Sequence, residues 1–367
     1  MKRGVNKLMN VMAASDATLD HMDPDLPEGL HVIEPLMYPG FRSAWQRKFN
    51  RIKLTRSIHQ CFGQTFATKP LVSRVPAQRS RRVVLTTLPI TADVVDRLDV
   101  DRWIYYCVDD YSRWPGTDHA VMHEMEWELV AKVDAVACVS ETLHERVASM
   151  GRGDATLLTH GVAASFWMLA NGPDNGRLHQ QVPMLTELNG SPLTFWGLID
   201  DRLDRTWIAE LSRACAESND DALKVCLVGP VVGDSKSWTS LTHDEGRFGS
   251  VMCCGRADHD LLPSVAYYSR VLIMPYGDAP VTRAMQPLKL LEYLATMKPV
   301  VVRDLPATRA WADCCDLAGD EKTFAKLVME RARTGTPADQ IEARKRRLPG
   351  ESWSAKAAQL AGLISAG

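Results

Sequence analysis

The sequence contains no long apolar run: nothing in it approaches the roughly 18 consecutive apolar residues that a membrane-spanning helix requires. Its basic opening stretch has only a broken apolar core, so we expect no secretory signal peptide. Neither positive nor negative charge is in clear excess. The formal net charge is −2, from 43 Lys and Arg against 45 Asp and Glu, which excludes binding to nucleic acid through bulk charge. These absences predict a cytoplasmic protein without a nucleic-acid partner.

Paired cysteine motifs and phosphate-binding glycine motifs are also missing. The nine cysteines include adjacent pairs at 253–254 and 314–315 but no C-x-x-C, which predicts buried free thiols rather than a zinc site or a disulfide framework. No G-x-G-x-x-G and no G-x-x-x-x-G-K-[ST] occurs, so nothing indicates a dinucleotide fingerprint or a P-loop. The acidic spacings at 23–25 and 99–101 lie in a proline-rich segment and at a helix end, and we expect no metal site.

What the chain does contain is an alternation of short apolar runs with amphipathic stretches. Its 367 residues, 46% of them hydrophobic and 24% charged, suffice for two globular domains. In the first half, predicted strands cover 81–89, 103–108 and 134–140, and predicted helices cover 91–100, 123–133 and 141–151. Continuous apolar strands separated by helices are typical of a parallel sheet with both faces covered. The fold class is therefore α/β.

The second half repeats this architecture after a connection at 171–192 that is rich in Gly, Pro and Asn. Predicted strands cover 193–198, 223–230, 250–255, 270–276 and 299–304, and predicted helices cover 204–218, 259–269, 287–297, 323–334, 339–348 and 352–364. We divide the chain into a first domain (1–170), a linker (171–192), a second domain (193–348) and a final helix (349–367). Two doubly wound sheets of this kind face a central cleft, and ligands bind beyond the carboxyl ends of their strands.

One predicted helix opens just beyond such a strand, with Pro287 at its start and Leu288 and Lys289 in its first turn. The free N–H groups of that turn carry about half a positive charge and form a site for phosphate, to which Lys289 adds a full charge. Glu292 lies three residues further along, on the same face. This pattern suits a nucleoside diphosphate, because the carboxylate accepts hydrogen bonds from ribose hydroxyls. An ordinary surface ion pair between Lys289 and Glu292 is the alternative.

Two glycines end neighbouring predicted strands of the second domain. Gly197 ends one strand and Gly229 the next, and a glycine lets a ligand approach the backbone. In the loop after Gly197, Arg202 has the side chain to clamp a phosphate with two parallel hydrogen bonds. Simple loop and cap chemistry is the alternative for this stretch, because Asp200 and Asp204 are suited to cap the next helix.

Three polar residues follow strands of the first domain and are candidates for catalysis. Asp109 and Asp110 end a buried strand, where they are placed to orient an acceptor or to serve as base. His160 follows another strand and is a candidate hydrogen-bond donor to a bound ligand. A capping role beside Ser112 for the two aspartates, and a structural role for the histidine, are the alternatives.

Several of these segments together resemble a known family. They are GLIDDRLD (197–204), VGP (228–230), the MPY strand end (274–276), PLKLLEYLA (287–295) followed by KPVV (298–301), and HGVAASFW (160–167). In them the chain is similar to the GT-B glycosyltransferases. It is most similar to the retaining group called glycosyltransferase family 4, which includes teichuronic-acid and other polysaccharide biosynthesis enzymes.

The resemblance implies two Rossmann-like domains, with a nucleotide-sugar donor held by the second and a glycan or lipid-linked acceptor held mainly by the first. It implies that Glu292 binds the donor ribose and that Arg202 and Lys289 neutralise the departing diphosphate. That is the task of a metal in other glycosyltransferases, so no cofactor is expected. It further implies that His160 donates to the sugar or the phosphate, that the transfer retains configuration, and that the final helix returns to the first domain.

The sequence departs from the family pattern in several places, two of which bear on catalysis and acceptor binding. The family often has a second glutamate eight residues before Glu292, where this chain has Ala284. Family members usually open with a strand, a Gly-rich turn and a helix, and no such unit is visible before residues 25–35. Either the chain starts late or the first domain is reduced. A nucleotide-sugar epimerase of the same fold, and a non-catalytic relative that acts as a binding or scaffold protein, are therefore the alternatives to a glycosyltransferase.

A basic segment at 41–58 is predicted to form an amphipathic helix. Trp45, Phe49 and Ile52 line one side of it, and arginine and lysine side chains cover the rest. Such helices lie on anionic membranes, which would suit a lipid-linked acceptor at the inner membrane face. A helix packed on its own domain, with a solvated basic face, is the alternative.

Overall fold

The computed structural model describes residues 32–67, 81–114, 116–168, 176–188, 192–218, 220, 222–232, 238 and 251–366. They form two compact units. The first holds the described residues up to Cys107 with Tyr111–Val136 and Val147–Asp154, and the second holds Val108–Asp110, Ala137–Arg146 and the described residues from Ala155 onwards. The expected boundary at residue 170 does not coincide with this division, because the segments that follow three strands of the first half group with the second unit.

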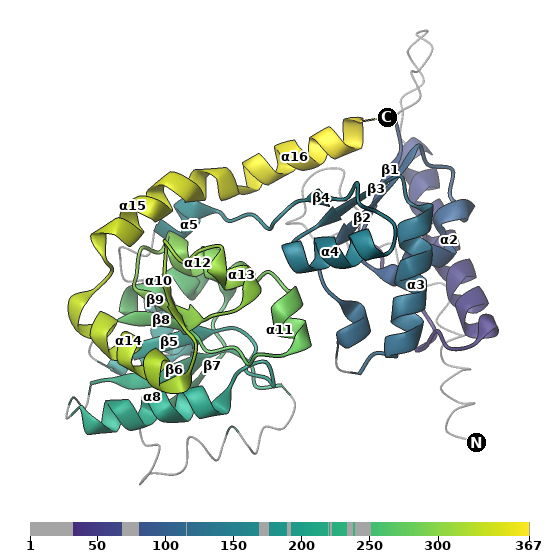
Figure 1. Cartoon of the computed structure of the whole chain (residues 1–367). Coiled ribbons are helices and arrows are strands. Elements are labelled where there is room, and N and C mark those ends of the chain that lie inside the picture. Colours follow the sequence, from purple (N-terminus) through teal and green to yellow (C-terminus); the bar gives the residue numbers. More distant parts are fainter. Residues whose placement is uncertain are drawn as a thin grey trace, which may run out of the picture. The chain divides into compact units, whose positions relative to one another are not determined.

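The larger sheet belongs to the second unit and has six parallel strands in the described residues, in the order β10-β9-β8-β5-β6-β7 (Figure 1). The strands are β5 (Pro192–Trp196), β6 (Lys224–Val228), β7 (Val251–Gly255), β8 (Val271–Met274), β9 (Val300–Arg303) and β10 (Asp316–Ala318). The central strands are buried along nearly their whole length, as their continuous apolar runs predict. The order reverses between β5 and β8, so a topological switch point lies where these two strands end.

Helices cover both faces of this sheet. On one face, α8 (Arg205–Glu217) packs against α14 (Glu321–Thr334) (Figure 1). The other face carries α10 (Leu262–Tyr268) and α12 (Leu288–Ala295), with α5 (Ala164–Met168) and α7 (Pro183–Glu187) beside them. Further described helices of this unit are α6 (Arg177–Gln181), α11 (Pro280–Ala284), α13 (Pro306–Arg309), α15 (Ala338–Arg347) and α16 (Trp353–Ser365). The return of α16 to the first domain stays a prediction.

The smaller sheet has four strands in the described residues, and they lie in chain order without a reversal. The strands are β1 (Val83–Thr86), β2 (Arg102–Cys107), β3 (Ala135–Cys138) and β4 (Thr156–Leu157), with α3 (His119–Lys132) between β2 and β3 and α4 (Glu141–Ser149) between β3 and β4. Among the described residues before β1, the chain forms the helix α2 (Ala44–Ala67) and no strand. The expected double winding is therefore seen in the larger sheet, whereas the described part of the smaller sheet winds in one direction only.

Part of the expected linker forms two short helices, which its composition does not predict. Helices α6 and α7 bury Leu178, Val182 and Leu185 in the core of the second unit. The spacing of these three residues follows one face of a helix, and this short stripe is the signal that the sequence prediction missed. Residues 171–175 and 189–191 of the expected linker lie outside the described residues.

Two further predictions meet the structure only in part. The predicted helix at 91–100 is replaced by two 3₁₀ turns, Pro89–Asp93 and Val95–Arg97, in which the chain is wound more tightly. The acidic spacing at 23–25 and most of the stretch 25–35 lie outside the described residues.

The basic segment forms α2, which has two different faces. Trp45 and Ile52 are 55% and 38% exposed, so the predicted apolar stripe is not packed away. Arg47, expected among the solvated basic side chains, turns inward: its Nη2 lies 2.8 Å from Asp93 Oδ1 and 2.6 Å from Glu128 Oε2. Hydrogen bonds to these two carboxylates hold the pKa of Arg47 above its usual range. One face of α2 is therefore held to its own unit by ion pairs, and the other face is exposed.

Membrane-spanning helices and disulfides were not expected from the sequence. No helix within the described ranges has both the length and the apolar character that crossing a bilayer requires. The cysteines whose side chains are described are all free thiols, and all of these except Cys253 are buried.

Candidate functional site

The loops that follow β5 and β6 meet at two glycines. Gly197 and Gly229 have φ angles of 134° and 145°, a region that side chains rarely adopt. A Cβ on Gly229 would lie 1.9 Å from the carbonyl oxygen of Gly197, and a Cβ on Gly197 would lie 2.3 Å from Lys289 Nζ. Both positions therefore require glycine. Gly197 in particular makes room for the Lys289 ammonium directly over the end of β5.

The helix α12 begins where the sequence predicts. Pro287 is its N-cap, and Leu288, which is 37% exposed, is its first residue. Lys289 Nζ donates to Tyr276 Oη at 2.6 Å and lies 4.6 Å from the centre of the Phe195 ring. These aromatic partners hold the ammonium without neutralising it. Among the described residues no carboxylate forms an ion pair with Lys289, so its charge is available to an anion, and the surface pair with Glu292 that the spacing allows is not formed.

The loop after β8 is tied to the loop after β5 at Tyr276. The Gly277 N–H donates to the carbonyl oxygen of Arg202 at 2.6 Å, and Arg303 Nη1 donates to the carbonyl oxygen of Tyr276 at 3.1 Å. The same Arg303 nitrogen lies 2.7 Å from Asp204 Oδ2. Asp204 is also the N-cap of α8, as the cap interpretation predicts. These bonds tie the backbone beside Tyr276 to the loop that carries Arg202, and the hydroxyl of the same buried tyrosine contacts Lys289.

Arg202 already has a partner inside its own loop. Its Nε lies 3.1 Å from both carboxylate oxygens of Asp200, and its Nη2 lies 2.8 Å from Oδ2. Burial lowers the pKa of Arg202, but the Asp200 hydrogen bonds and the electrostatic influence of Tyr276 and Asp109 raise it overall. Because Asp200 offsets its charge, Arg202 can clamp a phosphate only by sharing or exchanging this partner. Lys289 is the more available cation.

Glu292 points to a group of aromatic side chains. Its Oε2 accepts from Trp196 Nε1 at 3.3 Å, and its Oε1 lies 3.9 Å from His259 Nε2. The His259 ring stacks parallel to that of Phe166, with centroids 5.5 Å apart. Burial raises the pKa of Glu292, and the Trp196 hydrogen bond and the charges of His259 and Lys289 oppose this shift. The carboxylate therefore keeps lone pairs for a ligand hydroxyl beside one fixed indole partner.

His160 is connected to the start of α12 through the side chain of Gln286. The His160 N–H donates to Gln286 Oε1 at 2.7 Å, and Gln286 directly precedes Pro287. Burial lowers the pKa of His160, so its imidazole is neutral at neutral pH. A neutral imidazole donates through one nitrogen and accepts through the other, which keeps the predicted contact to a ligand chemically feasible.

The two aspartates after β2 lie in different surroundings. Asp110 is 4% exposed, and its Oδ1 lies 3.4 Å from Arg146 Nη2, so it has a structural partner. Asp109 lies close enough to Arg202 to contribute to the rise of that residue's pKa. A catalytic role for either aspartate stays a prediction.

The structure thus collects Gly197, Lys289 and Glu292 around the start of α12. The sequence prediction missed two residues that position them, Tyr276 and Trp196. A signal for both was present, because a large aromatic side chain with a polar tip at the end of a buried strand needs a hydrogen-bond partner. In the described part of the chain, no three His, Cys, Asp or Glu side chains are grouped to hold a metal ion. A metal-independent reaction stays a prediction.

Comparison with known proteins adds a curated relative. No family model matches the sequence. A stretch of 192 residues is 29% identical to TuaH of Bacillus subtilis strain 168, whose assignment as a teichuronic acid biosynthesis glycosyltransferase is itself provisional. The match covers 51% of this chain and 45% of TuaH, so the chain spans about half the length of the curated relative that it matches.

Solved structures share the two-sheet arrangement. HepE of Anabaena, in complex with UDP and glucose, matches over 90% of this chain and 84% of its own, with a TM-score of 0.65 and 10% identity. The chain has the GT-B fold. Sucrose-phosphate synthase of Thermosynechococcus elongatus matches over 98% and 92%, with a TM-score of 0.63 and 16% identity. This fold confirms the predicted α/β class and the fold that the resemblance implies.

Proposed function

We propose that the chain is a glycosyltransferase that moves a sugar from a nucleoside-diphosphate-sugar to a hydroxyl group of a glycan or lipid-linked acceptor. One observation carries the proposal. At the switch point of a GT-B fold, the start of α12 presents the ammonium of Lys289 without a neutralising carboxylate, and Glu292 lies one turn deeper with free lone pairs. HepE was solved with UDP and glucose, which makes UDP the first nucleotide to test.

In the proposed reaction, the bond between the anomeric carbon and the phosphate oxygen breaks through an oxocarbenium-like transition state. Negative charge develops on the leaving diphosphate. The Lys289 ammonium and the first-turn N–H groups of α12 stabilise that charge because they are in place before the bond breaks. Arg202 contributes to the extent that a phosphate replaces Asp200 as its partner.

The acceptor hydroxyl is proposed to attack from the face on which the diphosphate leaves. A new bond forms between its oxygen and the anomeric carbon, and its proton passes to an oxygen of the departing phosphate. Configuration is then retained, and neither a metal nor a protein nucleophile is required. Neutral His160 is proposed to donate to the sugar or the phosphate, and Asp109 or Asp110 to orient the acceptor or to serve as base.

Contact with an anionic membrane is proposed for the open face of α2. Trp45, Lys48, Ile52 and Arg56 are exposed and recur at helical spacing, so one side of the helix combines apolar and basic side chains. Such a face would bring a cytoplasmic enzyme to a lipid-linked acceptor. Co-sedimentation with phosphatidylglycerol vesicles tests it: a Lys48→Glu, Arg56→Glu variant should bind more weakly than the wild type. Equal binding of both proteins would contradict membrane contact through α2.

The proposed activity is tested in two steps: whether a donor stabilises the protein against thermal unfolding, and whether the donor is then turned over. UDP and UDP-sugars should raise the unfolding temperature, with GDP and ADP sugars measured in parallel. Adding an acceptor-containing membrane extract should then release UDP and yield a glycosylated product. If no nucleoside-diphosphate-sugar shifts the unfolding temperature, the proposal is wrong. Conversion of the donor without any acceptor would indicate an epimerase instead.

A further inference from the structure

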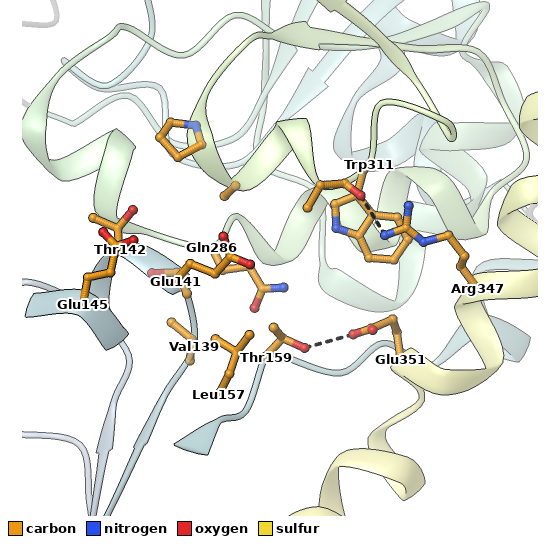
Figure 2. Close-up of a pocket in the computed structure, with 14 residues that line it drawn as sticks. Val139, Glu141, Thr142, Glu145, Leu157, Thr159, Gln286, Trp311, Arg347 and Glu351 are labelled. Carbon is orange, nitrogen blue, oxygen red and sulfur yellow. Dashed lines mark hydrogen bonds between the residues drawn. The ribbon is translucent and has the colours of Figure 1, made fainter. Parts of the chain in front are cut away.

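A cavity of about 360 Å³ lies in the second unit beside the segment that precedes α12 (Figure 2). Its wall is formed by the ends of β3 and β4, the start of α4, Gln286, α13 with Trp311, and the residues Arg347 and Glu351. The volume is in the range of pockets that hold small ligands, roughly 300 Å³ and above. Neither Lys289 nor Glu292 lines it, so it is distinct from the proposed donor site.

The lining combines apolar side chains with hydroxyl and amide groups. The apolar part consists of Val139, Leu157, Pro306, Ala307, Ala310 and Trp311. The neutral polar part consists of Ser140, Thr142, Thr159 and Gln286. A surface of this kind fits a ring that has C–H groups on one face and hydroxyl groups at its edge.

Two of the charged groups at the cavity are already neutralised. Arg347 bonds to Asp313, donates from Nη2 to the carbonyl oxygen of Ala310 at 2.7 Å, and lies 4.0 Å from the centre of the Trp311 ring. Glu351 lies 2.8 Å from Lys356 Nζ and accepts from Thr159 Oγ1 at 3.0 Å. Neither side chain has its charge available for a ligand.

Two further carboxylates are unmatched. Glu141 and Glu145 are four residues apart on α4, so they project from the same face of that helix and both line the cavity. Neither has an ionic or hydrogen-bonding partner among the described residues. Ionised carboxylates accept hydrogen bonds only, and two of them at one wall disfavour any anionic ligand.

Gln286 links this cavity to the proposed reaction. Its Oε1 is fixed by the His160 N–H at 2.7 Å, and its amide nitrogen points into the cavity (Figure 2). A group that accepts from this nitrogen would bind beside the residue proposed to contact the transferred sugar. The cavity therefore offers a hydrogen-bond donor from Gln286, two carboxylate acceptors from α4, and apolar lining side chains.

We propose that this cavity binds an uncharged, hydroxyl-rich ring, a neutral sugar residue of the acceptor. The inference rests on the proposed function and deepens it by excluding uronic acids and phosphosugars from this position. Ring hydroxyls donate to Glu141 and Glu145 and accept from Gln286, while the C–H groups of the ring pack against the apolar lining side chains.

The test is saturation-transfer NMR of the full chain with sugars that differ in charge. Methyl glycosides of glucose, galactose and mannose serve as neutral probes, glucuronate as the anion and glucosamine as the cation. At least one neutral glycoside should bind about tenfold more tightly than glucuronate. Ala307→Trp, which fills the cavity, should abolish that binding. Ala358→Trp on the exposed side of α16 is the matched control and should leave it unchanged.

A second variant keeps the test decisive if Ala307→Trp does not fold. Replacing Glu141 and Glu145 together by glutamine should bring glucuronate to within about threefold of the neutral probe. The inference is overturned if no neutral glycoside binds, if glucuronate or glucosamine binds as tightly as the best neutral probe, or if Ala307→Trp still binds. UDP binding is measured in parallel on each variant. If the wild type does not bind UDP, the proposed function is contradicted. If the wild type binds UDP but no neutral sugar, only the present inference is contradicted.

Discussion

The two sheets of this GT-B chain differ in strand order, and the proposed donor site lies where the order of the larger sheet reverses. The larger sheet reverses between β5 and β8, and the groups that suit a nucleotide, Lys289 and Glu292, gather at that reversal. The described part of the smaller sheet runs in chain order, and Asp110, which follows its strand β2, is committed to a protein partner, Arg146. The proposed donor site therefore lies in the second unit, whereas the acceptor side must be argued from residues that follow strands of the smaller sheet.

The largest expected effect comes from a methyl group at the reversal. Gly229→Ala places a Cβ 1.9 Å from the carbonyl oxygen of Gly197 at a φ of 145°, so the loops after β5 and β6 must move apart. We expect the free energy of unfolding to fall by about 3 kcal/mol, and we expect UDP no longer to stabilise the protein against unfolding. Gly153→Ala in the other unit meets nothing within 4 Å and should cost less than about 0.5 kcal/mol. Urea unfolding measures both, and equal stabilities would contradict the packing described here.

The next effect ranks the two cations. Lys289→Met removes the ammonium without an ionic partner and should weaken UDP binding by about ten- to a hundredfold. Arg202→Met should cost less, about threefold, because Asp200 already offsets that charge. Isothermal titration with UDP measures both, with Lys326→Met on the exposed side of α14 as control. A larger loss for Arg202→Met than for Lys289→Met would reverse the assignment.

A pH profile tests the carboxylate of the donor site. Burial raises the pKa of Glu292, and its ionised form is the one proposed to accept from ribose hydroxyls. UDP affinity should therefore fall on acidification at a higher pH than an ordinary glutamate would allow. Glu292→Gln should weaken binding about tenfold at neutral pH and flatten this part of the profile. Protonation of UDP itself is common to both proteins, so identical profiles would remove Glu292 from the site.

The smallest effect concerns the partner of that carboxylate. Trp196→Phe deletes the indole hydrogen bond that opposes the rise of the Glu292 pKa. The pKa should rise further, so the acid-side loss of UDP affinity begins at a higher pH, with about a twofold loss at neutral pH. Titrations at several pH values measure the shift, and a shift towards lower pH would show that Trp196 does not act through Glu292.

The elements at the donor site follow from local sequence signals. The continuous apolar runs of β5, β6, β8 and β9 identify buried parallel strands, and Pro287 marks the start of α12. Which partner a side chain selects is a matter of three-dimensional geometry that spacing does not specify. Arg202 bonds to Asp200 two residues away, and Lys289 bonds to Tyr276 instead of Glu292. These choices had to come from the structure.

The central claim is that the start of α12 holds the diphosphate of a nucleotide, and a crystal structure of the chain with UDP tests it most directly. The account predicts phosphate oxygens within hydrogen-bonding distance of Lys289 Nζ and of the first-turn N–H groups, and a ribose hydroxyl donating to Glu292. UDP bound elsewhere, with Lys289 still turned only to Tyr276, would contradict the account.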